Sequence, residues 1–374
     1  MTNSERPFLD FYKKHSIIPT FLEVTKKKDF FEQRNFLLAT LGIPLEIIKN
    51  ARIFELGPGT GQKTEHLLSL SPKSYVGVEN NEASIKQTLK IINQSHFEGP
   101  ANVRNFDFLD YEDSENYDFV LAELVVPTQR EPNVFIEKLI NLVSPNGFMI
   151  YNCIDPISML SETLRRAIVN KLGFINDNLD ISSKNIVDFF SKDLDLLPGM
   201  NRERSAWAID QIIKPAIGPM LSIPESLDAM ADKAVFHGSS PRFVEDYRWY
   251  KDPSSTIASV NNCARDNYWR KCHNFIDFRH IYEAQKPIKN RDLFKFSQSI
   301  YSAVVENEWS ENSDNQVTEN CEKILSLISQ NLSNTAGSLK SFLKFWQSGK
   351  VDDLDEFRPW WGRGTQYVSV IKLS

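Results

Sequence analysis

The sequence predicts an α/β protein with a doubly wound, largely parallel sheet that is extended by large helical segments. Three observations lead to this prediction. Short apolar runs alternate with stretches of helical spacing from residue 51 to residue 155, a glycine-rich loop directly follows the first run, and the alternation stops after Asp155. Regular alternation of this kind is typical of βαβ units, which place helices on both faces of a parallel sheet.

The first part of the chain is predicted to be helical. Apolar side chains recur there at helical spacing, as in Phe30, Phe31, Leu38 and Leu41, and the stretch stops at the turn formed by residues 42–44. We therefore expect residues 1–50 to form an N-terminal helical cap.

The central domain is predicted to span residues 51–155. Its strands are short apolar runs, separated by segments with helical spacing and by a Ser-Pro-Asn-Gly turn before the fifth run. The expected strands are 51–56, 75–79, 103–108, 117–121 and 148–154.

The remaining chain is predicted to consist mainly of helical inserts. Residues 156–361 have mostly helical spacing, and strand patterns return only at 234–238 and 366–372. We expect these two strands to complete the sheet of the central domain, and the inserts at 156–361 to bind the acceptor of any group that the domain transfers.

Composition and charge exclude several classes of protein. The 374 residues include 41% hydrophobic and 25% charged residues, with a formal net charge of −6, which is typical of a globular chain without a general affinity for nucleic acid. The four cysteines and six histidines form no metal-binding spacing. No signal peptide or membrane span is visible, so we expect a soluble, cytoplasmic protein.

The most informative motif is the run Glu55-x-Gly57-x-Gly59-x-Gly61 after the first strand. Glycines let the backbone turn tightly and approach a ligand, and the following helix offers its N-terminal amides. The dinucleotide fingerprint G-x-G-x-x-G needs its third glycine where this chain has Gln62. The spacing therefore disfavours a nicotinamide or flavin dinucleotide.

The motif instead resembles motif I of the class I S-adenosylmethionine-dependent methyltransferases, and residues 117–123 and 142–148 resemble later motifs of the same family. The resemblance covers residues 51–155 and, more weakly, 366–372, and it implies a Rossmann-like seven-stranded methyltransferase sheet. It implies S-adenosylmethionine as cofactor and S-adenosylhomocysteine as product. In that family the acidic residue at Glu79 binds the ribose hydroxyls, and the residues at Asp107 and Phe108 contact adenine. The implied cofactor-binding residues are Glu55, Gly57, Gly59, Gly61, Glu79, Asn80, Asp107, Phe108 and Ala122.

A weaker resemblance links the chain to bacterial methyltransferases associated with surface-polysaccharide gene clusters. It depends on the segments Leu197–Met200, Gly238–Pro241 and Tyr247–Lys251, together with the N-terminal Phe11-Tyr12-x-x-His15. It implies a glycan or a sugar nucleotide as the methyl acceptor.

Two residues are candidates for the catalytic base. Glu123 follows the fourth strand, and His237 is expected where the sixth strand opens onto the same edge, at which open α/β sheets bind their ligands. Arg242, Tyr247 and Arg248 follow, and arginine and aromatic side chains suit an anionic acceptor with a ring. A solvent-facing glutamate and a structural histidine are the alternatives for the first two residues.

Three functions compete. The first is O-methylation of a sugar, sugar nucleotide or other small anionic acceptor. The second is protein or peptide N-methylation, since Glu123 and Glu131 loosely resemble the paired glutamates of protein arginine methyltransferases. The third is a catalytically silent subunit that only binds S-adenosylmethionine. We expect a small-molecule or glycan partner and no metal; the oligomeric state stays open.

Overall fold

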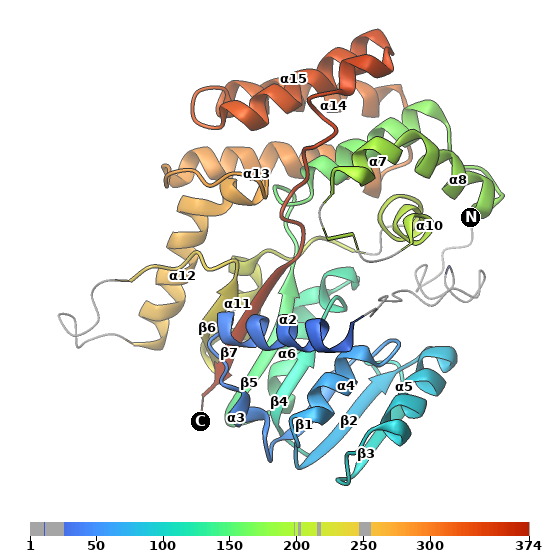
Figure 1. Cartoon of the computed structure of the whole chain (residues 1–374). Coiled ribbons are helices and arrows are strands. Elements are labelled where there is room, and N and C mark those ends of the chain that lie inside the picture. Colours follow the sequence, from blue (N-terminus) through green and yellow to red (C-terminus); the bar gives the residue numbers. More distant parts are fainter. Residues whose placement is uncertain are drawn as a thin grey trace. The chain divides into compact units, whose positions relative to one another are not determined.

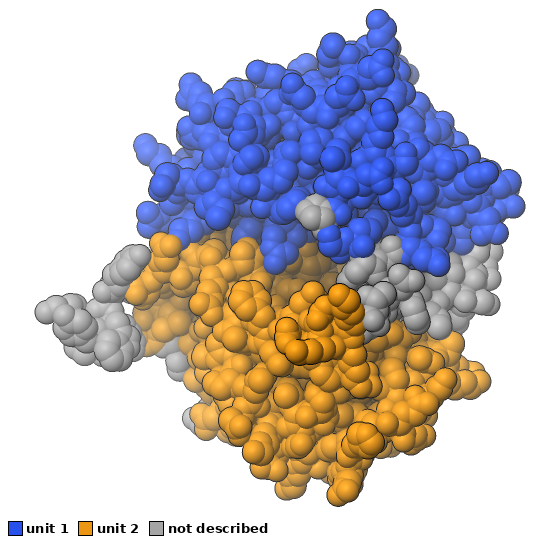
Figure 2. Space-filling view, in the orientation of Figure 1, with its two compact units in different colours: residues 1–11, 155–216, 269–364 blue, residues 12–154, 217–268, 365–374 orange. Residues whose placement is uncertain are grey.

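The structure is a computed structural model that describes residues 11, 26–197, 199–200, 203–214, 218–246 and 256–373. The chain divides into two compact units (Figure 2). One is formed by residues 1–11, 155–216 and 269–364, and the other by residues 12–154, 217–268 and 365–374. In the described residues, the second unit contains the β-sheet, whereas the first is built from helices.

The sheet has seven strands in the order β3-β2-β1-β4-β5-β7-β6 (Figure 1). All neighbouring strands are parallel except at β7, which is antiparallel to both β5 and β6. The predicted Rossmann-like, seven-stranded fold class is confirmed. The strands are β1 (Arg52–Leu56), β2 (Ser74–Glu79), β3 (Ala101–Asn105), β4 (Tyr117–Ala122), β5 (Val143–Cys153), β6 (Ala234–Ser240) and β7 (Gln366–Lys372).

One face of the sheet is covered by helices from both sides of the glycine loop. Leu38, Ile48 and Leu67 from these helices pack with Ile53 and Phe119 of the sheet in one buried apolar cluster. The ribbon of α2 crosses this face in Figure 1. The helices are α2 (Lys27–Thr40), α3 (Leu45–Ile48), α4 (Gln62–Ser69) and α5 (Glu82–Gln94).

The opposite face is covered by α6 (Pro132–Leu142) and α11 (Ile223–Met230). The Phe135 ring of α6 lies 5.0 Å from the Phe108 ring, which in turn lies 6.4 Å from the ring of Phe54 in β1. From α11, the Ser226 hydroxyl lies 2.9 Å from the Tyr151 hydroxyl of β5. A capping box at Ser222 fixes the start of α11.

The predicted insert is divided between the two units. Residues 217–268, which include α11, β6 and most of α12 (Ile257–Lys271), belong with the sheet. Asn261 of α12 shows why: its amide donates to the Ala234 carbonyl and accepts from the Phe236 amide, so it pairs with the backbone of β6.

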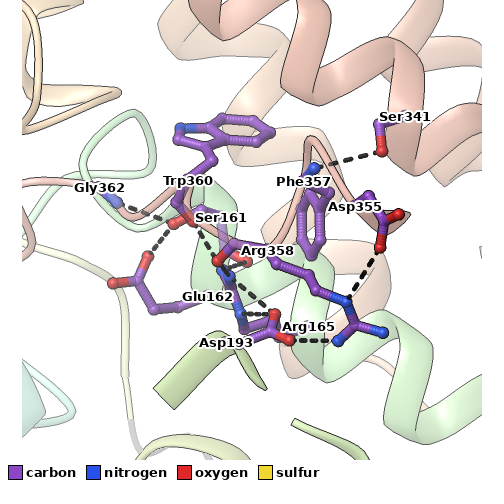
Figure 3. A network of polar contacts seen from close by, with 10 residues as sticks. All are labelled: Ser161, Glu162, Arg165, Asp193, Ser341, Asp355, Phe357, Arg358, Trp360 and Gly362. Carbon is purple, nitrogen blue, oxygen red and sulfur yellow. Dashed lines mark hydrogen bonds and ion pairs between the residues drawn. The ribbon is translucent and has the colours of Figure 1, made fainter. Parts of the chain in front are cut away.

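The helical unit surrounds a buried arginine, Arg165, on α7 (Figure 3). Its guanidinium donates to Asp193 and to the carbonyls of Arg358 and Trp360, and its central carbon lies 3.7 Å from the Trp361 ring centroid. These contacts fasten the segment before β7 to α7 and α9. The helices are α7 (Leu160–Leu172), α8 (Leu179–Phe189), α9 (Ser191–Asp195), α10 (Arg204–Trp207), α13 (Pro287–Tyr301), α14 (Glu311–Ile328) and α15 (Ser333–Ser348), with two π-helical segments, η2 (Ala208–Ile213) and η6 (Ser302–Glu306).

None of the helices in the described part of the chain combines the length and the apolar character that crossing a membrane requires.

Candidate active site

The glycine loop joins β1 to α4 at the carboxyl edge of the sheet. Gly57, Gly59 and Gly61 have φ angles of 67°, 59° and 83°, a region that other L-residues rarely adopt. A side chain at Gly61 would also meet Thr88 at 3.0 Å, whereas a Cβ at Gly59 would meet no atom within 4 Å. The loop therefore has open space on the side of Gly59, where a ligand can approach the backbone.

Glu79 closes one side of this space. Its Oε1 accepts hydrogen bonds from the amides of Asn80 and Asn81, both at 3.0 Å, and its Oε2 accepts from the Gly59 amide at 3.3 Å. Burial raises the pKa of Glu79, and these three amides oppose that effect. The carboxylate at the end of β2 is thus held directly beside the glycine loop.

Glu55 lies near the end of β1, two residues before the first glycine of the loop. The side chain is only 2% exposed and accepts from the Thr64 hydroxyl at 2.7 Å and the Tyr75 hydroxyl at 2.6 Å. Burial raises its pKa against the effect of these hydrogen bonds. Glu55 therefore ties β1 to α4 and β2, and this connection sets the position of the glycine loop.

These residues fit S-adenosylmethionine. The first-turn amides of α4 have no side-chain cap, and the loop is open at Gly59. Glu79 presents its carboxylate at the end of β2, which is separated from β4 by β1 alone. Backbone amides match carboxylate and carbonyl oxygens, and a carboxylate accepts hydrogen bonds from hydroxyl groups. When bound, the cofactor supplies an electrophilic methyl group on a sulfonium.

The loop after β3 differs from the prediction. Strand β3 ends at Asn105, three residues before the predicted end. Phe108 is 5% exposed and its ring packs between Phe54 and Phe135; its contact with a bound adenine stays a prediction. Phe106 is the exposed aromatic side chain of this loop, at 50%.

The two other predicted residues near this edge have the expected backbone positions. Asp107 follows β3 and its Oδ1 accepts from the Leu109 amide at 3.0 Å. Ala122 is the buried last residue of β4. Contact of Asp107 and Ala122 with the cofactor stays a prediction.

Glu123, directly after β4, is 5% exposed and is held by two cations. Arg34 Nη1 donates to its Oε2 at 3.1 Å, Arg34 Nη2 donates to its Oε1, and Lys63 Nζ lies 2.8 Å from Oε2. Burial alone would raise the pKa of Glu123, but Arg34 and Lys63 outweigh it and lower the pKa to about 2. The carboxylate is therefore ionised at neutral pH and is a weak base.

Sequence reasoning missed both cations. Arg34 lies on the buried side of α2 with Leu38, four residues further along, and a charged residue on an apolar stripe is the signal that could have revealed it. Lys63 is in the first turn of α4, two residues after Gly61. We name Arg34, Glu123 and Lys63 the edge cluster.

The backbone after Glu123 is also fixed. Leu124 has a φ angle of 63°, unusual for a residue other than glycine. Its amide donates to Oδ1 of the buried Asn152 on β5 at 2.7 Å. This hydrogen bond turns the chain sharply at the end of β4.

His237 is not where the sequence prediction places it. Strand β6 continues to Ser240, so His237 lies within the strand and not in the loop beyond it. Its Nε2 is 2.8 Å from the Gly42 carbonyl oxygen, and its ring lies 5.4 Å from the ring of Phe148. Phe148 lies in the middle of β5, which ends only at Cys153, so His237 packs on the sheet face and away from the carboxyl edge.

Of the three residues predicted to bind the acceptor, the structure describes Arg242. Arg242 donates to the carbonyls of Thr40 at 3.0 Å and Ala39 at 2.9 Å, and so binds the C-terminal end of α2. Tyr247 and Arg248 lie outside the described residues. Within the described part of the chain, no group of three or more His, Cys, Asp or Glu side chains is arranged to hold a metal ion.

Comparison with known proteins gives one family match and several similar solved structures. A family model described as "Methyltransferase domain" matches residues 47–187. Solved structures with similarity include the N-methyltransferase NodS from Bradyrhizobium japonicum WM9 in complex with S-adenosyl-L-homocysteine, at 11% identity, covering 40% of this chain and 74% of that one, with a TM-score of 0.32. PKMT2 from Rickettsia typhi in complex with AdoHcy is 12% identical, covering 83% of this chain and 74% of that one, with a TM-score of 0.42. A search of curated proteins found no match.

The family match covers the strand, glycine loop and helix that form the candidate site, together with Glu79 and Glu123. The order and directions of the seven strands are those of the class I methyltransferase sheet. Residues 47–187 therefore belong to a methyltransferase domain, its sheet has the strand order of the class I methyltransferases, and S-adenosylmethionine is the cofactor that such a domain uses.

Proposed function

We propose that this enzyme transfers the methyl group to an oxygen of a small anionic acceptor, such as a sugar nucleotide or another anionic sugar. The observation that supports this acceptor class is the charge of the edge cluster. Arg34 and Lys63 carry two positive charges, and Glu123 carries one negative charge because its pKa is lowered to about 2. Within these three residues one positive charge is left over, and it attracts an anionic group. Glu55 also interacts with Arg34 and Lys63, but burial raises its pKa and so favours its neutral form.

The same geometry changes the role proposed for Glu123. A carboxylate that already binds two cations is a poor proton acceptor, because protonation would leave both cations without their partner. Glu123 therefore orients Arg34 and Lys63. In-line methyl transfer depends mainly on alignment: the O–CH3 bond forms as the S–CH3 bond of the cofactor breaks. A hydroxyl acceptor releases its proton to solvent water in this step, whereas a carboxylate oxygen of an anionic sugar has no proton to lose.

The edge cluster has a second possible anion, the carboxylate of the cofactor's own methionine part. The two cases differ in what an Arg34 variant changes. Loss of a contact with the cofactor weakens S-adenosylmethionine binding, whereas loss of a contact with the acceptor raises the acceptor KM at saturating cofactor.

The test of the acceptor class is a turnover screen with S-adenosylmethionine and three sets of acceptors: sugar nucleotides, neutral oligosaccharides and lysine- or arginine-containing peptides. Mass spectrometry detects a mass increase of one methyl group and its position. We expect O-methylation in the first set. Methylation of peptide nitrogens alone would contradict the proposal and favour protein or peptide N-methylation. Cofactor binding without turnover of any class would favour a catalytically silent subunit.

A further inference from the structure

Two neighbouring arginines on α7 differ in how their charges are satisfied. Arg165 is fully buried, and both its Nε and its Nη2 donate to Asp193 Oδ1, at 3.2 and 3.0 Å (Figure 3). The Nε–Nη2 edge of a guanidinium offers two parallel donors, and carboxylates and phosphates bind there. In Arg165 this edge is occupied by a carboxylate of the protein.

In Arg166 the same edge has no acceptor from the described residues. The one hydrogen bond of its guanidinium runs from Nη1 to the Lys214 carbonyl at 2.9 Å, while Nε is enclosed by protein and lacks a partner. No carboxylate in the described part of the chain pairs with Arg166. Burial lowers its pKa, and the Tyr301 hydroxyl opposes this shift.

The surroundings of Arg166 are irregular in a way that is common at binding sites. Lys214, which accepts from Arg166, ends the π-helical segment η2, and Tyr301 directly precedes the π-helical segment η6. One turn after Arg166, the amide of Asn170 donates to the Val304 carbonyl of η6 at 3.1 Å. Two π-helical segments therefore flank Arg166, and such segments occur frequently at functional sites.

An unpaired, partly buried cation costs stability unless something compensates its charge. We propose that Nη2 of Arg166 binds the oxyanion of a ligand, a phosphate or a carboxylate group, in the helical unit. Nε is enclosed, whereas Nη2 is neither enclosed nor hydrogen-bonded to a described residue and the side chain is partly exposed, so a small anion can reach Nη2. This inference depends only on α7 and its neighbours and is independent of the methyl acceptor proposed above.

Nuclear magnetic resonance on the full chain tests the proposal with two probes in chloride buffer of constant ionic strength. Inorganic phosphate is followed by the width of its ³¹P line, and acetate by saturation transfer to its methyl protons. We expect at least one probe to bind wild-type protein. The Arg166→Met variant should bind it roughly 10- to 100-fold more weakly, which corresponds to one charge-assisted hydrogen bond. Arg166→Lys should lie between the two, because it keeps the charge but not the planar guanidinium donor.

Arg279 provides the matched control. Its side chain is 25% exposed, and its Nε and Nη2 already donate to the two oxygens of Asp277 at 2.9 and 2.7 Å. Arg279→Met should therefore leave binding of the probe unchanged. Binding of phosphate alone identifies a phosphorylated ligand, and binding of acetate alone identifies a carboxylate. Absence of binding of both probes to wild-type protein, or equal binding by wild-type and Arg166→Met protein, would overturn the proposal.

A stability measurement separates this role from a structural one. Arg165→Met should lower the urea midpoint of unfolding, because it removes the guanidinium that donates to the Asp193 carboxylate and to two backbone carbonyls. Arg166→Met should keep or raise the midpoint, because it removes a charge that no carboxylate pairs. An equal fall in both variants would show that Arg166 is a structural residue and would contradict the proposal.

Discussion

Arg34 donates to both carboxylate oxygens of Glu123, although the two residues are 89 positions apart in the chain. The contact joins α2, the helix before the sheet, to the end of β4. Lys63 on α4, the helix after the glycine loop, binds the same carboxylate and brings in a third element. Because these three elements meet at one carboxylate, Glu123 fixes the position of two cations at the cofactor edge.

The first prediction concerns acid stability. The folded-state pKa of Glu123, about 2, lies below the ordinary value of 4.5, so its contribution to the free energy of unfolding is present above pH 4.5 and is lost as the pH falls toward 2. Glu123→Gln should therefore be less stable than wild type by about 3 kcal/mol at pH 7. The difference should shrink between pH 4.5 and 2, as measured by urea unfolding at several pH values. A difference that does not vary with pH would contradict the assigned ion pairs.

The second prediction concerns Glu79. Glu79→Ala should weaken S-adenosylmethionine binding by about 1–3 kcal/mol, because hydroxyl groups of the cofactor would lose their acceptor. Calorimetry measures this directly. Glu82→Ala is the matched control, since Glu82 is exposed in the first turn of α5; it should bind the cofactor as wild type does. Unchanged affinity in Glu79→Ala would remove Glu79 from the site.

The third prediction concerns Arg34. Arg34→Met keeps most of the side-chain volume but removes the charge, so the edge cluster loses its excess positive charge. We expect the acceptor KM to rise by roughly 10-fold or more, with a smaller change in the affinity for S-adenosylmethionine. Steady-state kinetics at saturating cofactor and calorimetry separate the two effects. A rise in the cofactor Kd alone would assign Arg34 to the cofactor.

The fourth prediction concerns His237. Because its ring contacts the Gly42 carbonyl and Phe148, His237→Asn should lower stability by about 1 kcal/mol through the lost contacts. Turnover per folded enzyme should stay close to that of wild type. A fall in kcat of roughly 10²-fold or more with an unchanged fold would show that His237 acts as the base after all.

The sequence predicted the framework of the site because its signals are local. The glycine run, the acidic residue at the end of β2 and the alternation of strands and helices each lie within a few residues, and the structure has them in the predicted order. The predicted end of β3, at Phe108, lies three residues after the observed end at Asn105. Strand ends are weakly encoded, since Phe106 and Phe108 both suit a strand and only tertiary packing decides which one is buried.

The edge cluster could not be predicted from local pattern, because its three residues come from α2, α4 and the end of β4. A glutamate after a strand suggests a base until its partners are known. The predicted position of His237 was wrong for a related reason. Strand β6 has a register shift between Phe236 and Gly238, and the side of the sheet that His237 faces follows from that shift and from the position of α2.

The most direct test of the central assignment is calorimetric titration of the full chain with S-adenosylmethionine and with S-adenosylhomocysteine, in the presence of a metal chelator. The glycine loop and Glu79 supply amides and a carboxylate, and no described group of side chains is arranged to hold a metal ion. We therefore predict binding of both compounds, one per chain, with NAD showing no competition. Tight binding of NAD without binding of S-adenosylmethionine would contradict the account.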